Sequence, residues 1–340
     1  MNKQIQILKE IDRMRNFMNN VQVTGVVVKD SISDFVTRDG KELLGGSLVV
    51  RTQDGSEVEV NVITNRYKKD TYEESYFYTY YTKLKENLVT LENADDPTQA
   101  SVVRITDGEF IDNVFKNANG DTIESNKINC KFINIVEPNK VQDTVQQALF
   151  SVEGIVTGIN DEMVNNMPTG NLIVYLDMIQ TNLVDANGNP TFDKTKGKVN
   201  PFGIIPIKLK VDKGMATAFK SAGYYVGCFT KFIGEVINTV EVERVIEQMA
   251  FGEPVTKEIK KHIKCYLIKS GSNPTTPETQ ELTQDVLTML RNARKAKIDN
   301  KLGGSSNGGM QEGVFGSTHV QNPTPASTPT NNGGFTNPFI

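Results

Sequence analysis

The sequence predicts a mainly β protein that contains two copies of one small barrel domain. Two stretches of the 340-residue chain repeat each other at nearly constant spacing. The first repeat opens with VTGV at 23–26, and the second opens 129 residues later with VEGI at 152–155. A related pair of stretches, 128–133 and 263–268, closes the repeats 135 residues apart. Because both ends recur in the same order, we expect two similar domains, over residues 21–140 and 141–270.

The first repeat predicts three strands, a helix and further strands. Gly25 lies inside the first strand, where a glycine indicates the bend or bulge that small closed barrels need. Asp54 and Gly55 separate two alternating runs, which is typical of a hairpin turn. The expected strands are 21–29, 47–53, 57–64, 101–106, 109–116 and 127–136, with a helix over 67–92.

The second repeat predicts the same order of elements. Its strands are expected at 151–159, 171–180, 204–211, 226–238 and 261–269, with a helix over 213–222 and an insertion over 181–202. Gly154 takes the place of Gly25. Three strands, a helix and two more strands resemble the OB-fold, a five-stranded Greek-key barrel. The resemblance implies two tandem OB-fold five-stranded barrels.

Flanking segments complete the predicted organisation. Residues 1–20 have apolar side chains at helical spacing, which indicates an N-terminal helix that packs on the first domain, mediates self-association or binds a partner. Residues 278–300 predict an amphipathic helix, with Thr276 or Thr279 as its cap. Residues 303–340 are rich in Gly, Asn, Ser, Thr and Pro, with Glu312 as the one charged side chain, so we expect a disordered tail.

Motifs for catalysis, metals and cofactors are absent from the sequence. It has two histidines and three scattered cysteines, and it lacks the common nucleotide-binding and hydrolase motifs. We therefore expect no enzyme activity, no metal site and no cofactor. No run of 18 apolar residues occurs, so we expect no membrane span, and the location is predicted to be the cytoplasm (the host cytoplasm for a phage-encoded protein).

The charge distribution separates the two repeats. Residues 21–140 carry 20 acidic and 14 basic side chains, whereas residues 141–270 carry 14 of each. In the first repeat, Glu57 and Glu59 alternate with valines, so carboxylates are predicted on the outer face of that strand. A polyanion is therefore expected to bind the second repeat.

Basic side chains beside aromatic ones mark the predicted DNA-binding surface. Lysines neutralise phosphates and aromatic rings stack on bases, which suits a sequence-tolerant binder of single strands. In the second repeat the predicted residues are Tyr175, Phe192, Lys194, Lys196, Lys198, Phe202, Lys208 and Lys210. Another set, Arg66, Tyr67, Lys68 and Lys69, begins an aromatic run in the first repeat. The alternatives are a solvated charged loop for the first set, and packing or a protein interface for the second.

The low-charge tail ending in Pro-Phe-Ile resembles the C-terminal tail of bacterial and phage single-stranded DNA-binding proteins. In that family the tip recruits replication and repair proteins, which implies partner binding by Phe335, Pro338, Phe339 and Ile340. This tip lacks the acidic residues of the family pattern, and Ile340 follows the phenylalanine. The resemblance implies a non-catalytic protein of phage DNA replication or recombination, and a homo-oligomer is one possible state. The alternative is a virion or assembly scaffold that uses both barrels for protein contacts.

Overall fold

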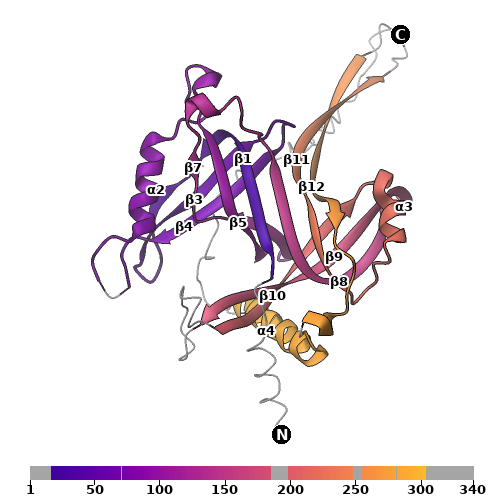
Figure 1. The fold of residues 1–340 in the computed structure, drawn as a ribbon. Coiled ribbons are helices and arrows are strands. Elements are labelled where there is room, and N and C mark those ends of the chain that lie inside the picture. The colour runs from indigo at the N-terminus through magenta and orange to yellow at the C-terminus, as the bar shows by residue number, and fades with distance from the viewer. Residues whose placement is uncertain are drawn as a thin grey trace, which may run out of the picture. The chain divides into compact units, whose positions relative to one another are not determined.

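The computed structural model describes residues 17–69, 71–184, 198–247, 251, 255–280 and 282–303. The predicted mainly β class is confirmed, with twelve strands in one hydrogen-bonded sheet among these residues. The sheet closes on itself twice and so forms two five-stranded rings (Figure 1). Both rings belong to one compact unit, and the predicted boundary between two domains stays a prediction.

The first ring closes through β1, β3, β4, β6 and β5, and β5 pairs back onto β1. The β4–β6 pair is parallel and the other pairs are antiparallel. Valines 58, 60 and 62 are buried as predicted, because alternate side chains of β4 face the core. The elements are β1 (Asn19–Asp30), β2 (Ser33–Val36), β3 (Glu42–Arg51), β4 (Glu57–Asn65), α2 (Tyr76–Asn87), β5 (Val102–Lys116), β6 (Thr122–Asn129) and β7 (Asn134–Ile135), with short 3-10 helices at Pro97–Gln99 and Pro138–Lys140.

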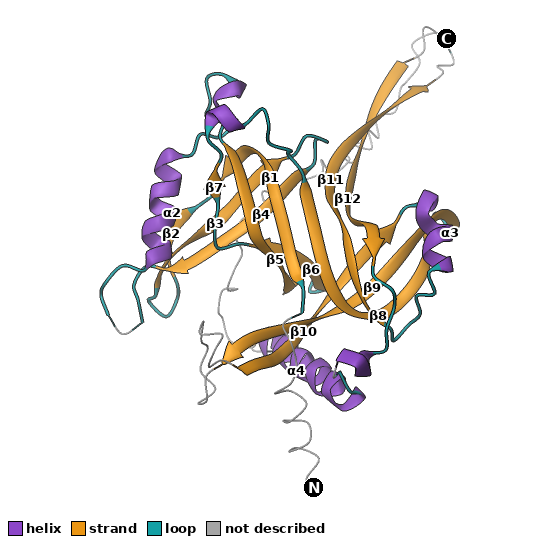
Figure 2. Cartoon of the chain, in the orientation of Figure 1, coloured by secondary structure: helices purple, strands orange, loops and turns teal. Residues whose placement is uncertain are grey.

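The second ring repeats this topology. Strands β8, β9, β10, β12 and β11 pair in order, β11 returns to β8, and the β10–β12 contact is again parallel. Its elements are β8 (Ala148–Val164), β9 (Met167–Val184), β10 (Lys198–Val211), α3 (Lys213–Ser221), β11 (Phe229–Glu247) and β12 (Val255–Gly271). A 3-10 helix at Pro277–Gln280 and α4 (Gln284–Gly303) follow, and α4 packs along β10 (Figure 2).

The glycines in the first strands have the same role in both rings. A Cβ atom on Gly25 would lie 2.2 Å from the Arg51 carbonyl oxygen. A Cβ atom on Gly154 would lie 2.3 Å from the Asp177 carbonyl oxygen. The second strand of each ring can therefore cross the first closely only where the first has no side chain.

Antiparallel pairing between β1 and β8 joins the rings. The first strand of one repeat pairs with the first strand of the other, from Asn19 opposite Val152 to Val23 opposite Ala148. Residues 19 and 20, expected in the N-terminal helix, therefore begin β1, and residues 1–16 lie outside the described part of the chain.

Several element boundaries differ from the expected ones. The helix predicted over 67–92 spans 76–87, because the chain before it folds into a loop in which the Ser75 amide donates to the Arg66 carbonyl oxygen. The strands expected at 101–106 and 109–116 form one strand, β5, whose register against β1 shifts before Gly108. The last helix begins at Gln284, and the Val286 amide donates to the Thr283 hydroxyl, so Thr283 rather than Thr276 or Thr279 caps it.

Candidate nucleic-acid interface

The outer face of β9 and β10 in the second ring brings together three of the predicted site residues, Tyr175, Lys208 and Lys210. Ile205, Ile207 and Leu209 are buried, so the alternating side chains of β10 point outward. Lys208 is exposed, and its side chain forms no ion pair with a described residue. It is thus a cation available to a ligand on this face.

Tyr175 is the cross-strand neighbour of Lys208. The two residues are directly paired between β9 and β10, and on the other side Tyr175 is paired with Gly158 of β8. A Cβ atom on Gly158 would lie 3.1 Å from the Tyr175 ring, so the ring lies close over the glycine. Tyr175 is 39% exposed. An accessible aromatic ring beside an unpaired lysine can stack on a base and contact a phosphate.

Lys210 lies on the same strand but has a partner. Its ammonium is 2.9 and 3.0 Å from the two carboxylate oxygens of Glu162. Burial opposes ionisation of Glu162, but hydrogen bonds from Asn171, Lys210 and Thr169 outweigh it and lower the pKa to about 2. Lys210 is therefore a structural cation in this conformation.

Helix α4 covers the other end of this face. Its apolar residues and Leu282, which precedes the helix, form a buried cluster with outward-facing isoleucines of the second ring. The members are Leu282, Val286, Leu287, Leu290, Ile155, Ile179, Ile204, Phe17 and Phe229. The Arg291 guanidinium lies 3.1 Å from the Asp177 carboxylate, next along β9 from Tyr175 on the same face. Burial raises the pKa of Asp177, and Arg291 opposes that rise. The amphipathic pattern predicted this helix but gave no signal for its position.

The first-ring set is largely engaged in contacts of its own. Arg66 pairs with Glu42 at 2.8 Å, and its guanidinium lies 5.3 Å from the Tyr67 ring centroid. Lys68 pairs with Glu73 at 2.7 Å. Lys69 is exposed. On the outer face of this ring Glu57 pairs with Arg51 and Glu59 is exposed, so carboxylates are present there as predicted.

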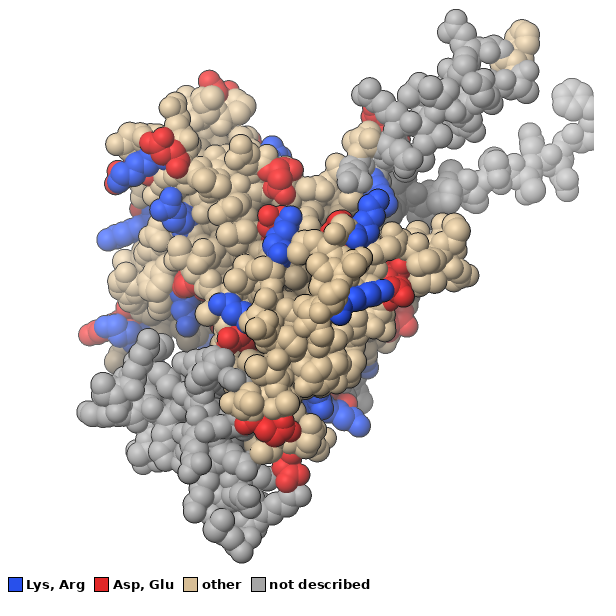
Figure 3. Space-filling model, turned by 45° about the vertical axis from the view of Figure 1, so that its right-hand side comes forward, with Lys and Arg blue, Asp and Glu red and all other residues tan. Residues whose placement is uncertain are grey.

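Charges of both signs are interspersed over the described residues of the face drawn in Figure 3. A surface of this kind attracts a polyanion through local contacts more than through a continuous positive field.

Two of the remaining predicted residues, Lys198 and Phe202, are part of strand β10. Phe192, Lys194 and Lys196 lie outside the described residues, as do Phe335, Pro338, Phe339 and Ile340.

The described residues contain no group of three or more His, Cys, Asp or Glu side chains arranged to hold a metal ion. No helix in this part of the chain is long and apolar enough to cross a membrane.

The fold consists of two five-stranded barrels that share one strand order and are joined in one sheet. The outer face of the second barrel presents the accessible Tyr175 ring beside the Lys208 side chain. The chain belongs to the YorF family, whose model matches residues 18–303. No curated protein matches it.

Solved structures similar to this chain include a single-stranded DNA-binding protein and a complex with single-stranded DNA. The wild-type protein from Thermus aquaticus is 10% identical, with a TM-score of 0.40 over 77% of this chain and 95% of that chain. A deletion mutant of the same protein is 9% identical, with a TM-score of 0.40 over 76% and 95%. A replication protein A heterotrimer bound to single-stranded DNA is 13% identical, with a TM-score of 0.19 over 75% and 51%.

Proposed function

We propose that this protein binds single-stranded DNA without sequence preference and without catalysis, in phage DNA replication or recombination. The observation that carries the proposal is the pairing of Tyr175 with Lys208 on the outer face of the second barrel. The ring is accessible and the lysine has no ion-pair partner among the described residues. Stacking on a base and contact with a phosphate can therefore occur side by side, and neither requires a particular base.

The rest of the second barrel supports this face. Glu162 neutralises Lys210, and α4 occupies the neighbouring surface, so the accessible platform is small. We propose that residues 181–202, with Phe192, Lys194, Lys196, Lys198 and Phe202, extend it.

Titration of a fluorescent oligo-dT over a salt series tests the proposal. In the variant Tyr175→Ala/Lys208→Gln, loss of one stacked base should weaken binding about 5- to 150-fold, from about 1–3 kcal/mol per base. The log–log salt slope should fall by about 0.7 for the lost phosphate contact. The control Tyr76→Ala/Lys83→Gln removes the same side-chain types from exposed positions on α2 and should leave affinity unchanged.

Three outcomes decide between the functions. Loss in the first variant alone supports the proposal. If both variants bind as tightly as the parent chain, the DNA site lies elsewhere. No salt-dependent binding to any single strand by the unmodified chain refutes DNA binding and favours the assembly scaffold.

We also propose that the tail recruits replication proteins through Phe335, Pro338, Phe339 and Ile340. Deletion of residues 335–340 should leave DNA affinity unchanged and abolish co-purification of those proteins. Retention of all such partners by the truncated protein would refute this role.

A further inference from the structure

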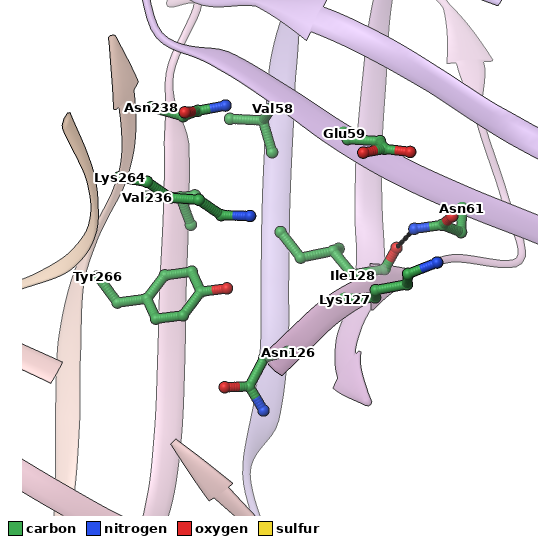
Figure 4. Close-up of a pocket in the computed structure, with 10 residues that line it drawn as sticks. All are labelled: Val58, Glu59, Asn61, Asn126, Lys127, Ile128, Val236, Asn238, Lys264 and Tyr266. Carbon is green, nitrogen blue, oxygen red and sulfur yellow. Dashed lines mark hydrogen bonds between the residues drawn. The ribbon is translucent and has the colours of Figure 1, made fainter. Parts of the chain in front are cut away.

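A pocket lies where strands β4 and β6 of the first barrel meet β11 and β12 of the second (Figure 4). Its apolar lining consists of Val58, Ile128 and Val236. Its polar lining includes two lysines, three asparagines, Tyr266 and Glu59. Polar groups therefore dominate the lining, which suits a charged or polar ligand better than an apolar one.

Hydrogen bonds between the barrels hold both walls of the pocket. The Asn238 side-chain amide of β11 donates to the Glu57 carbonyl oxygen of β4, at 2.6 Å. The Asn126 side-chain amide of β6 donates to the Pro206 carbonyl oxygen of β10, at 3.0 Å. Because these bonds join different barrels, the pocket is a defined part of the packed structure.

The two lysines of the pocket are without a partner among the described residues. The side chains of Lys127 and Lys264 form no ion pair or hydrogen bond with a described residue. By contrast, Lys269, farther along β12 from Lys264, lies 3.0 Å from the Glu235 carboxylate. Figure 4 shows the Lys264 ammonium directed from β12 toward the first barrel.

Tyr266 supplies a hydrogen-bond donor beside Lys264. Its ring packs against Phe110 with centroids 4.8 Å apart, and Figure 4 shows its hydroxyl directed into the pocket. The hydroxyl forms no hydrogen bond with a described residue. Burial raises the pKa of Tyr266 to about 12, so the proton stays on the oxygen near neutral pH.

We propose that this pocket binds the phosphate of a nucleotide, which the Lys264 ammonium and the Tyr266 hydroxyl hold. Lys127 adds a second positive charge from β6. Glu59, the one carboxylate of the lining, lies beside Asn61 and away from Lys264 (Figure 4). A free mononucleotide and a nucleotide within a bound single strand share this chemistry. The proposal therefore stands apart from the Tyr175 face.

Calorimetric titration of the full chain with dAMP, and separately with oligo-dT, tests the site. Lys264→Gln should weaken the dAMP or oligo-dT interaction at least tenfold. Tyr266→Phe should weaken it about threefold or more, since the phenyl ring preserves the packing against Phe110. The matched control Lys261→Gln removes an exposed lysine from the same strand and should change neither titration.

The two arms identify the source of the nucleotide. If the parent chain binds dAMP and Lys264→Gln weakens that binding, the pocket is a site for free nucleotides. If Lys264→Gln weakens only the binding of oligo-dT, the pocket is a site for a nucleotide of a bound strand. If dAMP does not bind, and Lys264→Gln also leaves oligo-dT affinity unchanged while Tyr175→Ala reduces it, the pocket proposal is refuted and the proposed function stands.

Discussion

Arg294 of α4 holds the last helix against the first barrel, so its replacement should destabilise the folded unit. Its guanidinium donates to both carboxylate oxygens of Asp112 on β5, at 2.8 and 3.1 Å, and to Glu124 on β6 at 2.7 Å. The Arg294 and Asp112 side chains are each 17% exposed, whereas Glu124 is 53% exposed. The contact with Asp112 should therefore contribute more to the free energy of unfolding than the contact with Glu124.

The expected magnitude follows from this partial burial. Removing one partner of a fully buried ion pair costs about 3–5 kcal/mol, and exposed pairs contribute about 0–1 kcal/mol. We expect Arg294→Gln to lower the free energy of unfolding by about 1–3 kcal/mol, because Asp112 is left without its charged partner. Arg294→Lys should restore part of the loss, since an ammonium cannot donate in the same two-pronged geometry.

Urea unfolding followed by far-UV circular dichroism measures this effect, because the chain has no tryptophan to report by fluorescence. Lys295→Gln changes the charge of an exposed neighbour on α4 and should shift stability by less than about 0.5 kcal/mol. Equal stabilities of the Arg294→Gln and Lys295→Gln variants would show that α4 is not held by this pair.

Two further predictions concern the second barrel. Gly154→Ala should cost about 1–3 kcal/mol or more in thermal or urea unfolding, because its Cβ would clash with the backbone of β9; a variant as stable as the parent would contradict the close crossing. Because the pKa of Glu162 is lowered to about 2, its contribution to stability is present above its unfolded pKa and is lost as pH falls from about 5 to about 2. Glu162→Gln should therefore be less stable than the parent at pH 7, and the difference should shrink toward pH 2 in acid-titrated unfolding; a gap independent of pH would refute this reading.

Local patterns predicted the strands because alternation and turn residues act over a few positions. Val58, Val60 and Val62 face the core as their spacing indicated, and the Asp54–Gly55 turn joins β3 to β4. Gly25 and Gly154 were identified as a matched pair, and their shared crossing geometry explains the match. A repeat in sequence thus corresponded to a repeat in backbone contacts.

Contacts between distant segments could not be read from local patterns. Nothing in β1 or β8 alone indicates that the two strands pair, since each also has the alternation of an ordinary barrel strand. The apolar stripe of α4 predicts a helix that packs somewhere, and the outer face of the second barrel becomes its site only in the fold. The pocket with Lys264 has the same origin, because its walls come from both repeats.

Pairing of charges in the fold also changes how the basic residues of the sequence are interpreted. Arg66, Lys68 and Lys210 each lie within 3.0 Å of a carboxylate oxygen, whereas Lys208 has no such partner among the described residues. A phosphate that approached a paired lysine would first have to displace the carboxylate. On the described part of the second barrel, stacking on Tyr175 should therefore contribute more to affinity than neutralisation of phosphates. That balance predicts a shallow salt dependence for the face itself, with any steeper part of the slope supplied by lysines elsewhere in the chain.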